Sequence, residues 1–323
     1  MSAKPPHILL APMEGVVDPV IRELYSDLGG YDEMVTEFVR VTDKLNPDHI
    51  FQKYSPELLK GGKTKAGTPV ALQLLGGQPQ PLAENADAAI RLGAPAIDLN
   101  FGCPAKTVNR HDGGATLLKK PERLFDIISA VKRAADGRVP VCAKVRLGFE
   151  DKSLHKDIAR AVNDAGAARL VIHARTKVEG YKPPAHWEYM AWMAEECSIP
   201  VYGNGDIWSV EDYQKCVEVS GLRNVALGRG AMARPNLALQ IKALDAGKDL
   251  PHLGFEPLFK IWIRRFAADS FNHAGEKYAL NRTKQWTKLL GRNYDQSVAL
   301  FESIKRFRSY QDMSAVIHQD APN

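Results

Sequence analysis

The 323-residue sequence predicts an α/β fold, a (β/α)8 TIM barrel, followed by a smaller all-α helical region. Short apolar runs rich in Val, Ile and Leu recur along the first two-thirds of the chain, and helix-like stretches separate most of them. The last part of the chain carries only helical spacing. Buried strands that alternate with helices indicate parallel βαβ units, and eight such units make a barrel. We therefore expect a barrel domain at 1–247 and a helical domain at 248–323.

The eight apolar runs are the predicted strands. They lie at 7–13, 33–39, 69–76, 96–102, 139–148, 169–176, 199–207 and 223–232. A doubly wound sheet is the alternative fold. Eight units are many for such a sheet, and no strand–GxGxxG–helix pattern is present, so the barrel is favoured.

Helical patterns fill the intervals between strands and the end of the chain. Stretches at 81–94, 121–137, 154–167 and 210–221 are predicted helices, and several end in Gly, as helix C-termini commonly do. Three amphipathic patterns follow at 255–271, 277–294 and 296–310. We expect their apolar side chains in the core and their basic side chains on the surface. The first set is Phe259, Trp262, Phe266, Trp286 and Leu290, and the second is Arg282, Lys284, Lys288, Lys305 and Arg308.

The charge distribution is uneven. The net charge is +5, and the chain from position 252 onward contains eleven Lys or Arg against seven Asp or Glu. A basic appendage on a nearly neutral body favours a phosphate-rich partner, although a solvated helix face is equally often basic.

The sequence indicates a cytoplasmic protein without a membrane segment. No apolar run approaches the ~20 residues needed to cross a bilayer, and the start of the chain does not read as a signal peptide. The four cysteines form no C-x-x-C pair, which indicates a reducing compartment and no zinc site. We expect Cys142, Cys197 and Cys216 to be packing residues.

Polar residues gather at the ends of the predicted strands. Strand side chains alternate in direction, so Lys144 and Arg146 share one face, and active sites of TIM barrels lie at the C-terminal ends of the strands. The sequence therefore predicts an active site at this rim. Its members are Met13, Glu14, Glu37, Gln73, Asn100, Cys103, Lys144, Arg146, His173, Arg175, Asn204, Asp206 and Arg229.

The last two predicted strands end in glycine-rich turns. Gly205, Gly228 and Gly230 leave backbone N–H groups open to close approach, and Arg229 adds a cation. TIM barrels commonly bind phosphate after strands 7 and 8, so these turns together favour a phosphate site.

Lys144 and Cys103 leave more than one chemistry open. Lys144 could form a Schiff base, or it could supply positive charge to a bound flavin ring, for which Gln73 and His173 are suitable hydrogen-bonding neighbours. Cys103, on a Gly–Cys–Pro turn, could act as an acid or a nucleophile.

Three classes of function are to be weighed against the sequence. They are a flavin-dependent reductase acting on RNA, another barrel enzyme (a reductase of a small pyrimidine or a lysine Schiff-base lyase), and a non-catalytic RNA-binding module. The basic helical region argues against a small substrate. The polar residues at the strand ends argue against a non-catalytic RNA-binding module.

The stretch "DLNFGCPAKTVNRHDGGATLL" (98–118) closely resembles the tRNA-dihydrouridine synthases. It follows "LLAPMEGVVD", "TEFVRV" and "QLLG", and it precedes "AKVRLG", "VIHART", "GNGDI" and "LGRGA", in the order found in that family. The "TEFVRV" segment, the Trp after "GNGDI" and "RTKQW" are similar to the bacterial C group, which modifies uridine 16 of the D-loop.

The resemblance implies an FMN-dependent enzyme that reduces the C5=C6 bond of a D-loop uridine in tRNA to dihydrouridine, with NADPH as reductant. It implies Cys103 as the proton donor, a monomer, no metal and no protein partner. The residues expected to hold FMN are Pro12, Met13, Glu14, Gln73, Lys144, His173, Asn204, Gly205, Asp206, Gly228 and Arg229. Those expected to contact the RNA are Arg40, Asn100, Arg146, Tyr278, Arg282 and Lys305.

The residue types suit this chemistry. The C5=C6 bond of uracil is conjugated to a carbonyl, so hydride adds at C6 and negative charge develops at C5 and the carbonyl oxygen. Arg146 and Asn100 would stabilise that charge, and Cys103 would protonate C5. The target base would have to leave its stack to reach the site.

Overall fold

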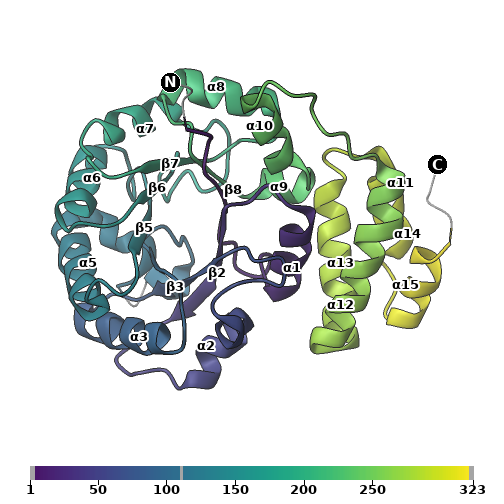
Figure 1. Ribbon diagram of the computed structural model, residues 1–323, viewed down its shortest axis with the longest axis horizontal. Coiled ribbons are helices and arrows are strands. Elements are labelled where there is room, and N and C mark those ends of the chain that lie inside the picture. The colour runs from purple at the N-terminus through teal and green to yellow at the C-terminus, as the bar shows by residue number, and fades with distance from the viewer. Residues whose placement is uncertain (1–3, 110–111, 320–323) are drawn as a thin grey trace.

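The computed structural model describes residues 4–109 and 112–319 and contains the predicted barrel (Figure 1). Eight parallel strands follow one another around the barrel in chain order, and β1 pairs with β8 to close it. The eight-stranded prediction is confirmed. The strands are β1 (Ile8–Leu10), β2 (Glu33–Arg40), β3 (Val70–Leu75), β4 (Ile97–Asn100), β5 (Val141–Arg146), β6 (Leu170–His173), β7 (Val201–Asn204) and β8 (Val225–Leu227).

Several strands are shorter than the apolar runs that predicted them. The clearest case is the run 223–232, where the strand ends at Leu227 and a short helix, α9 (Arg229–Ala233), follows at once. Both segments are buried, and apolar content alone does not separate a buried strand from a buried helical turn. The early end of β8 matters because it places Gly228 and Arg229 at the barrel mouth.

Helices surround the barrel (Figure 1). The four predicted between strands are present, and α1, α2 and α7 appear where no helix was predicted. Cys197 lies beyond the end of α7 and is half-buried. The helices are α1 (Pro19–Leu28), α2 (Asp48–Tyr54), α3 (Pro79–Arg91), α4 (Lys106–Asn109), α5 (Pro121–Ala135), α6 (His155–Asp164), α7 (Trp187–Ala194), α8 (Val210–Ser220) and α10 (Leu237–Asp245), with 3-10 turns η1 (Pro56–Lys60) and η2 (Gly114–Lys119).

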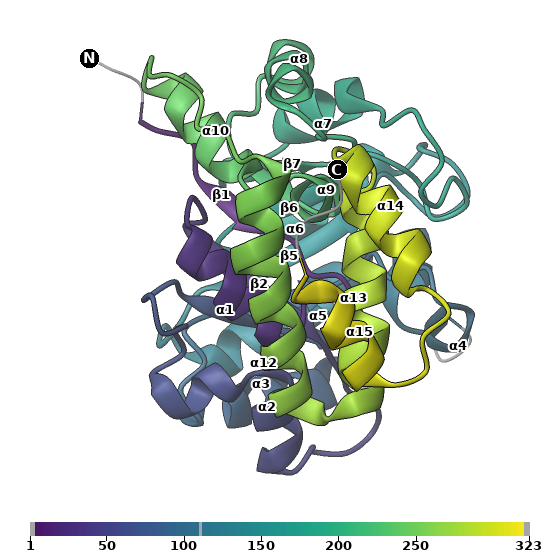
Figure 2. The ribbon, with the colours of Figure 1, turned by 90° about the vertical axis from the view of Figure 1, so that its right-hand side faces the viewer.

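A second group of helices lies beside the barrel, next to α1 and α9 (Figures 1 and 2). It comprises α11 (Phe255–Pro257), the π-helical segment η3 (Leu258–Ile263), α12 (Arg264–Ala274), α13 (Glu276–Leu290), α14 (Asp295–Ile304) and α15 (Tyr310–Ile317). The predicted domain division at 247/248 falls in the loop that joins α10 to α11.

The helical region departs from its prediction at two points. The helix predicted over 296–310 ends at Ile304, and Tyr310 begins a separate helix, α15, that was not predicted. Of the five apolar side chains predicted in the core, four are buried, whereas Trp262 is only partly covered.

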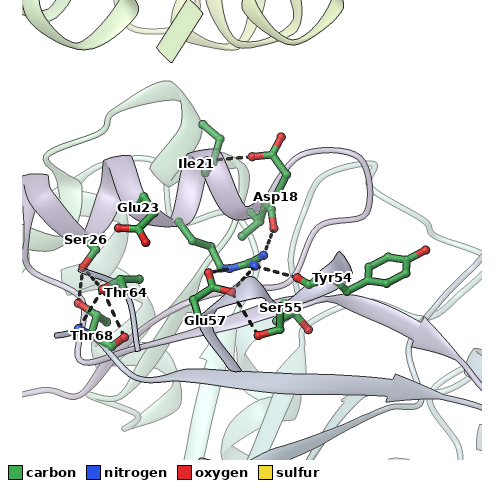
Figure 3. A network of polar contacts seen from close by, with 12 residues as sticks. Asp18, Ile21, Glu23, Ser26, Tyr54, Ser55, Glu57, Thr64 and Thr68 are labelled. Atoms are coloured by element: carbon green, nitrogen blue, oxygen red, sulfur yellow. Dashed lines mark hydrogen bonds and ion pairs between the residues drawn. The ribbon is translucent and has the colours of Figure 1, made fainter. Parts of the chain in front are cut away.

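A buried ion pair fastens α1 to the segment after β2. Arg22 and Glu57 are almost fully covered, and the Arg22 Nε atom lies 2.8 Å from the Glu57 carboxylate. Arg22 also donates to the carbonyl oxygens of Val17 and Tyr54 (Figure 3). Because a buried guanidinium requires such a set of acceptors, this network fixes the start of α1 against the barrel. Within the described ranges, no helix is long and apolar enough to cross a membrane.

Candidate active site

A cavity of about 290 Å³ opens at the C-terminal ends of the strands, and residues from the end of each of the eight strands line it. This volume is near the lower end of the range for small-molecule sites. The structure brings all eleven predicted cofactor residues to the cavity wall, together with Cys103, Asn100 and Arg146. The eleven are Pro12, Met13, Glu14, Gln73, Lys144, His173, Asn204, Gly205, Asp206, Gly228 and Arg229.

Lys144 and His173 present polar groups to the cavity without a protein partner. Within the described part of the chain, neither side chain makes a hydrogen bond or an ion pair. Burial, with Arg146 nearby, lowers the pKa of Lys144 to about 8. Burial and the surrounding cations hold the pKa of His173 well below its usual range, so its imidazole is neutral at pH 7. A cation beside a neutral imidazole fits the carbonyl-rich edge of a flavin ring.

A chain of hydrogen bonds orients the amides at the base of the cavity. Gln73 Nε2 donates to the Asp98 carboxylate at 2.7 Å, and Asn100 Nδ2 donates to Gln73 Oε1 at 2.8 Å. Asn100 Oδ1 in turn accepts from the Gly102 amide at 3.0 Å. Asp98 is fully buried and was not predicted as a site residue, although it stands in the D-x-N segment of the sequence.

The two glycine-rich turns pack against each other. A Cβ atom at Gly230 would lie 1.8 Å from the carbonyl oxygen of Ile207, so only glycine fits there. Gly205 has a φ of +126°, a conformation that favours glycine. The Asp206 carboxylate accepts from Arg175 and lies 3.8 Å from the Arg229 guanidinium. The packing of the two turns against each other leaves Gly228 and Arg229 at the cavity wall.

Two aromatic residues that were not predicted also line the cavity. Two guanidinium groups lie near the Trp208 ring, with Arg292 3.6 Å and Arg229 5.1 Å from its centre. Tyr181 is 53% exposed, and Arg146 and Arg229 lie 5.3 Å and 5.0 Å from its ring centre. Trp208 follows "GNGDI", so its position offered a signal. Tyr181 comes from the loop after β6, where no periodic pattern marks it.

Cys103 lies at the cavity wall on a firmly held turn. Its carbonyl oxygen accepts from the Ala115 amide at 3.1 Å and from Asn109 Nδ2 at 3.2 Å. Burial raises the pKa of the Cys103 thiol, and the Glu14 carboxylate adds to this effect. A hydrogen bond from the Ala105 backbone and the nearby Arg146 and Arg40 act in the opposite direction but do not outweigh it. The thiol therefore keeps its proton at pH 7, which favours an acid over a nucleophile.

Glu14 lines the cavity, whereas Glu37, predicted at the same rim, lies on β2 and is not one of the lining residues. Partial desolvation and the nearby Glu37 carboxylate raise the pKa of Glu14 to about 7. Desolvation also raises the pKa of Glu37, although the Gly15 amide donates to its carboxylate.

The predicted RNA contacts fall into two groups. Asn100 and Arg146 line the cavity, and Arg146 donates to three backbone carbonyl oxygens, including that of Gly102 at 2.7 Å. The other four predicted residues do not line it. Among them, Arg40 and Lys305 are exposed.

The prediction that Arg282 lies on an exposed basic face is wrong. Its side chain is only 9% exposed, and its Nε atom lies 2.6 Å from the Asp18 carboxylate. The Asp18 carboxylate takes the place of the water that the guanidinium loses on burial, so the charged side chain is tolerated in the interior. Tyr278, one turn earlier on α13, also donates to Asp18. Lys284, predicted on the same face, is partly buried and donates to the Phe307 carbonyl oxygen.

A closed barrel with a polar cavity at its C-terminal rim defines the class of TIM-barrel enzymes. Residues 9–290 match the family model described as "Dihydrouridine synthase (Dus)". The chain belongs to the dihydrouridine synthase family. Family membership favours the reductase over the Schiff-base lyase and over the non-catalytic RNA-binding module.

Similar proteins agree with this assignment. The "tRNA-dihydrouridine(16) synthase" of Aquipseudomonas alcaligenes is 48% identical, with 93% of this chain and 95% of that protein aligned. The protein of the same name from Shewanella oneidensis is 45% identical, with 97% of each chain covered.

Solved structures that resemble this one support the fold alone. The old yellow enzyme homologue from Zymomonas mobilis has a TM-score of 0.52 at 13% identity and covers 76% of this chain and 90% of its own. Histamine dehydrogenase from Rhizobium sp. 4-9 has a TM-score of 0.56 at 15% identity and covers 81% of this chain and 48% of its own.

Proposed function

We propose that the protein is an FMN-dependent tRNA-dihydrouridine synthase that reduces the C5=C6 bond of uridine 16 in the D-loop of tRNA, with NADPH as reductant. The observation that carries this proposal is that the Lys144 and His173 side chains, without hydrogen-bond partners among the described residues, line one cavity together with Cys103. The names of the 44–50% identical relatives support the position of the uridine. We further propose a monomer that works in the cytoplasm.

Different residues of the cavity would bind the ring and the phosphate of FMN. Lys144 would place positive charge beside the ring, and the Asp98-oriented Gln73 amide would hydrogen-bond to it. Gly228 and Arg229 would hold the phosphate at the turn after β8. When bound, FMN supplies the hydride that reduces the base.

Side chains of the protein would transfer the proton and stabilise the developing negative charge. Cys103 would donate the proton from its Sγ atom, because it lines the cavity and its thiol is protonated at pH 7. Arg146 stabilises negative charge on the base, and its three bonds to backbone carbonyls hold the guanidinium in place for that task.

The RNA would be held outside the cavity and the base inside it. We propose that exposed Arg40 and Lys305 contact the RNA, and that Asn100 and Arg146 contact the base after it has left its stack. Tyr278 and Arg282 donate to Asp18 and are therefore not proposed as RNA contacts.

The first test is a visible absorption spectrum of the purified protein before and after anaerobic addition of NADPH. We expect flavin bands that bleach, and then dihydrouridine at position 16 of tRNA that lacked it. Dihydrouridine at another position would overturn the assignment of the uridine. A colourless protein that added FMN does not restore, with a borohydride-trapped adduct on Lys144, would support the Schiff-base lyase instead.

A further inference from the structure

The loop between β1 and α1 forms one wall of the cavity and also caps a helix. Met13, Glu14 and Val16 line the cavity from this loop. At its end, Asp18 Oδ1 accepts from the Ile21 amide at 2.8 Å, which caps the N-terminus of α1 (Figure 3). Asp18 Oδ2 points elsewhere and accepts from Arg282 Nε at 2.6 Å and from the Tyr278 hydroxyl.

Arg282 reaches this loop from α13, more than 260 residues further along the chain. Besides Asp18, it donates from Nη1 to the Gly15 carbonyl oxygen at 2.9 Å and from Nη2 to the Val16 carbonyl oxygen. The planar guanidinium thus contacts three acceptors within the four-residue stretch 15–18, on Gly15, Val16 and Asp18. Such a fork fixes the path of the loop in a way that a single ammonium cannot.

The loop is held from the other side as well, and α13 is itself anchored. The Glu37 carboxylate on β2 accepts from the Gly15 amide. On α13, Trp286 is buried and its Nε1 atom donates to the Met232 carbonyl oxygen of α9 at 3.2 Å. Arg282 therefore clamps the cavity wall from an element with a fixed position on the barrel.

We propose that Arg282 is a positioning residue of the cofactor site, which holds the 13–18 loop in the form that binds FMN, and that it is not a contact to tRNA phosphate. The inference rests on the proposed FMN-dependent function. All three side-chain nitrogens of Arg282 donate to protein acceptors, and the group is only 9% exposed, so a phosphate outside the protein has little access to it. Tyr278 supports the same clamp through its bond to Asp18.

The test measures FMN affinity of the full-length protein without RNA, by flavin fluorescence on reconstitution of the apoprotein. We expect Arg282→Met to raise the dissociation constant of FMN at least about tenfold, and Arg306→Met, an exposed arginine of the same region, to leave it unchanged. Tyr278→Phe removes one donor to Asp18 and folds more safely, so it should cause a smaller change in the same direction. The wild-type protein must bind FMN; if it does not, the proposed function itself fails.

Salt dependence of tRNA binding separates the two roles of Arg282. At saturating FMN, we expect the slope of log affinity against log salt to be the same for Arg282→Met and wild type, because no phosphate contact has been lost. Unchanged FMN affinity in both Arg282→Met and Tyr278→Phe, with a slope reduced by about one unit in Arg282→Met, would overturn the proposal and make Arg282 a phosphate contact.

Discussion

Burial raises the pKa of the Cys103 thiol and the Glu14 carboxylate adds to this effect, so the site does not activate the thiol as a thiolate nucleophile. The cations at the rim, which would activate a nucleophilic thiolate, have the weaker effect on its pKa. The direction of this pKa shift favours the proposed acid over a nucleophile, and the choice between the two stays a prediction.

We predict that Cys103→Ala keeps bound FMN and its reduction by NADPH but lowers dihydrouridine formation by about 10²–10⁴-fold, the usual contribution of a positioned acid. Single-turnover assays with tRNA measure both steps. Cys197→Ala is the matched control, because that thiol lies outside the cavity and donates only to the Ala159 carbonyl oxygen. Wild-type turnover in Cys103→Ala would remove the thiol from the reaction.

Residue types at strand ends were enough to predict most of the cavity wall, and the reason is geometric. Parallel strands of one barrel end at one rim, so a polar residue at the end of each must meet the others. Asp98 was not predicted because it contacts Gln73 and does not itself line the cavity. Tyr181 was not predicted because it lies in an irregular loop. Arg282 was misplaced because its buried acceptor, Asp18, is distant in sequence.

At the scale of elements, the turn after β8 depends on its contact with the loop after β7. We predict that Gly230→Ala lowers the free energy of unfolding by about 1–3 kcal/mol, since the added methyl group would overlap the Ile207 carbonyl oxygen. FMN affinity should fall too, because Gly228 and Arg229 belong to the same turn. Thermal unfolding and flavin titration measure the two effects.

Gly254→Ala provides the control for Gly230→Ala. Gly254 has a φ of −69°, and an added Cβ would meet only ordinary contacts at 3.5 Å and 3.8 Å. If Gly230→Ala changed the free energy of unfolding and the FMN affinity no more than Gly254→Ala does, the contact between the two turns would not be needed for either.

The existence of most elements was predictable, whereas several of their ends were not. Apolar periodicity identified eight strands and the helical region because burial requires it. It did not show that the run 223–232 divides into β8 and α9, or that the last amphipathic pattern breaks after Ile304. These breaks depend on turns and contacts with other elements, which the periodicity does not record.

At the scale of the whole molecule, the barrel supplies the cavity and the helical region supplies exposed basic groups. We predict that Lys305→Gln weakens tRNA binding and reduces the salt slope by about one, with FMN binding unchanged, because Lys305 is exposed and lies outside the cavity. Lys215→Gln, an exposed lysine of α8, is the control. Equal slopes for the two variants would contradict a phosphate contact by Lys305.

The closure of the barrel by β1 and β8 also governs the order in which the site forms during synthesis. Ile8 has no β8 partner until Val225 has been made, and Asp18 has no partner on α13 until Arg282 follows. At about 5–20 residues per second, the first strand waits on the order of ten seconds or more with one edge unpaired. A nascent chain that stalls before α13 would therefore lack the Arg282 and Tyr278 contacts to Asp18, so the 13–18 loop should reach its final form late in translation.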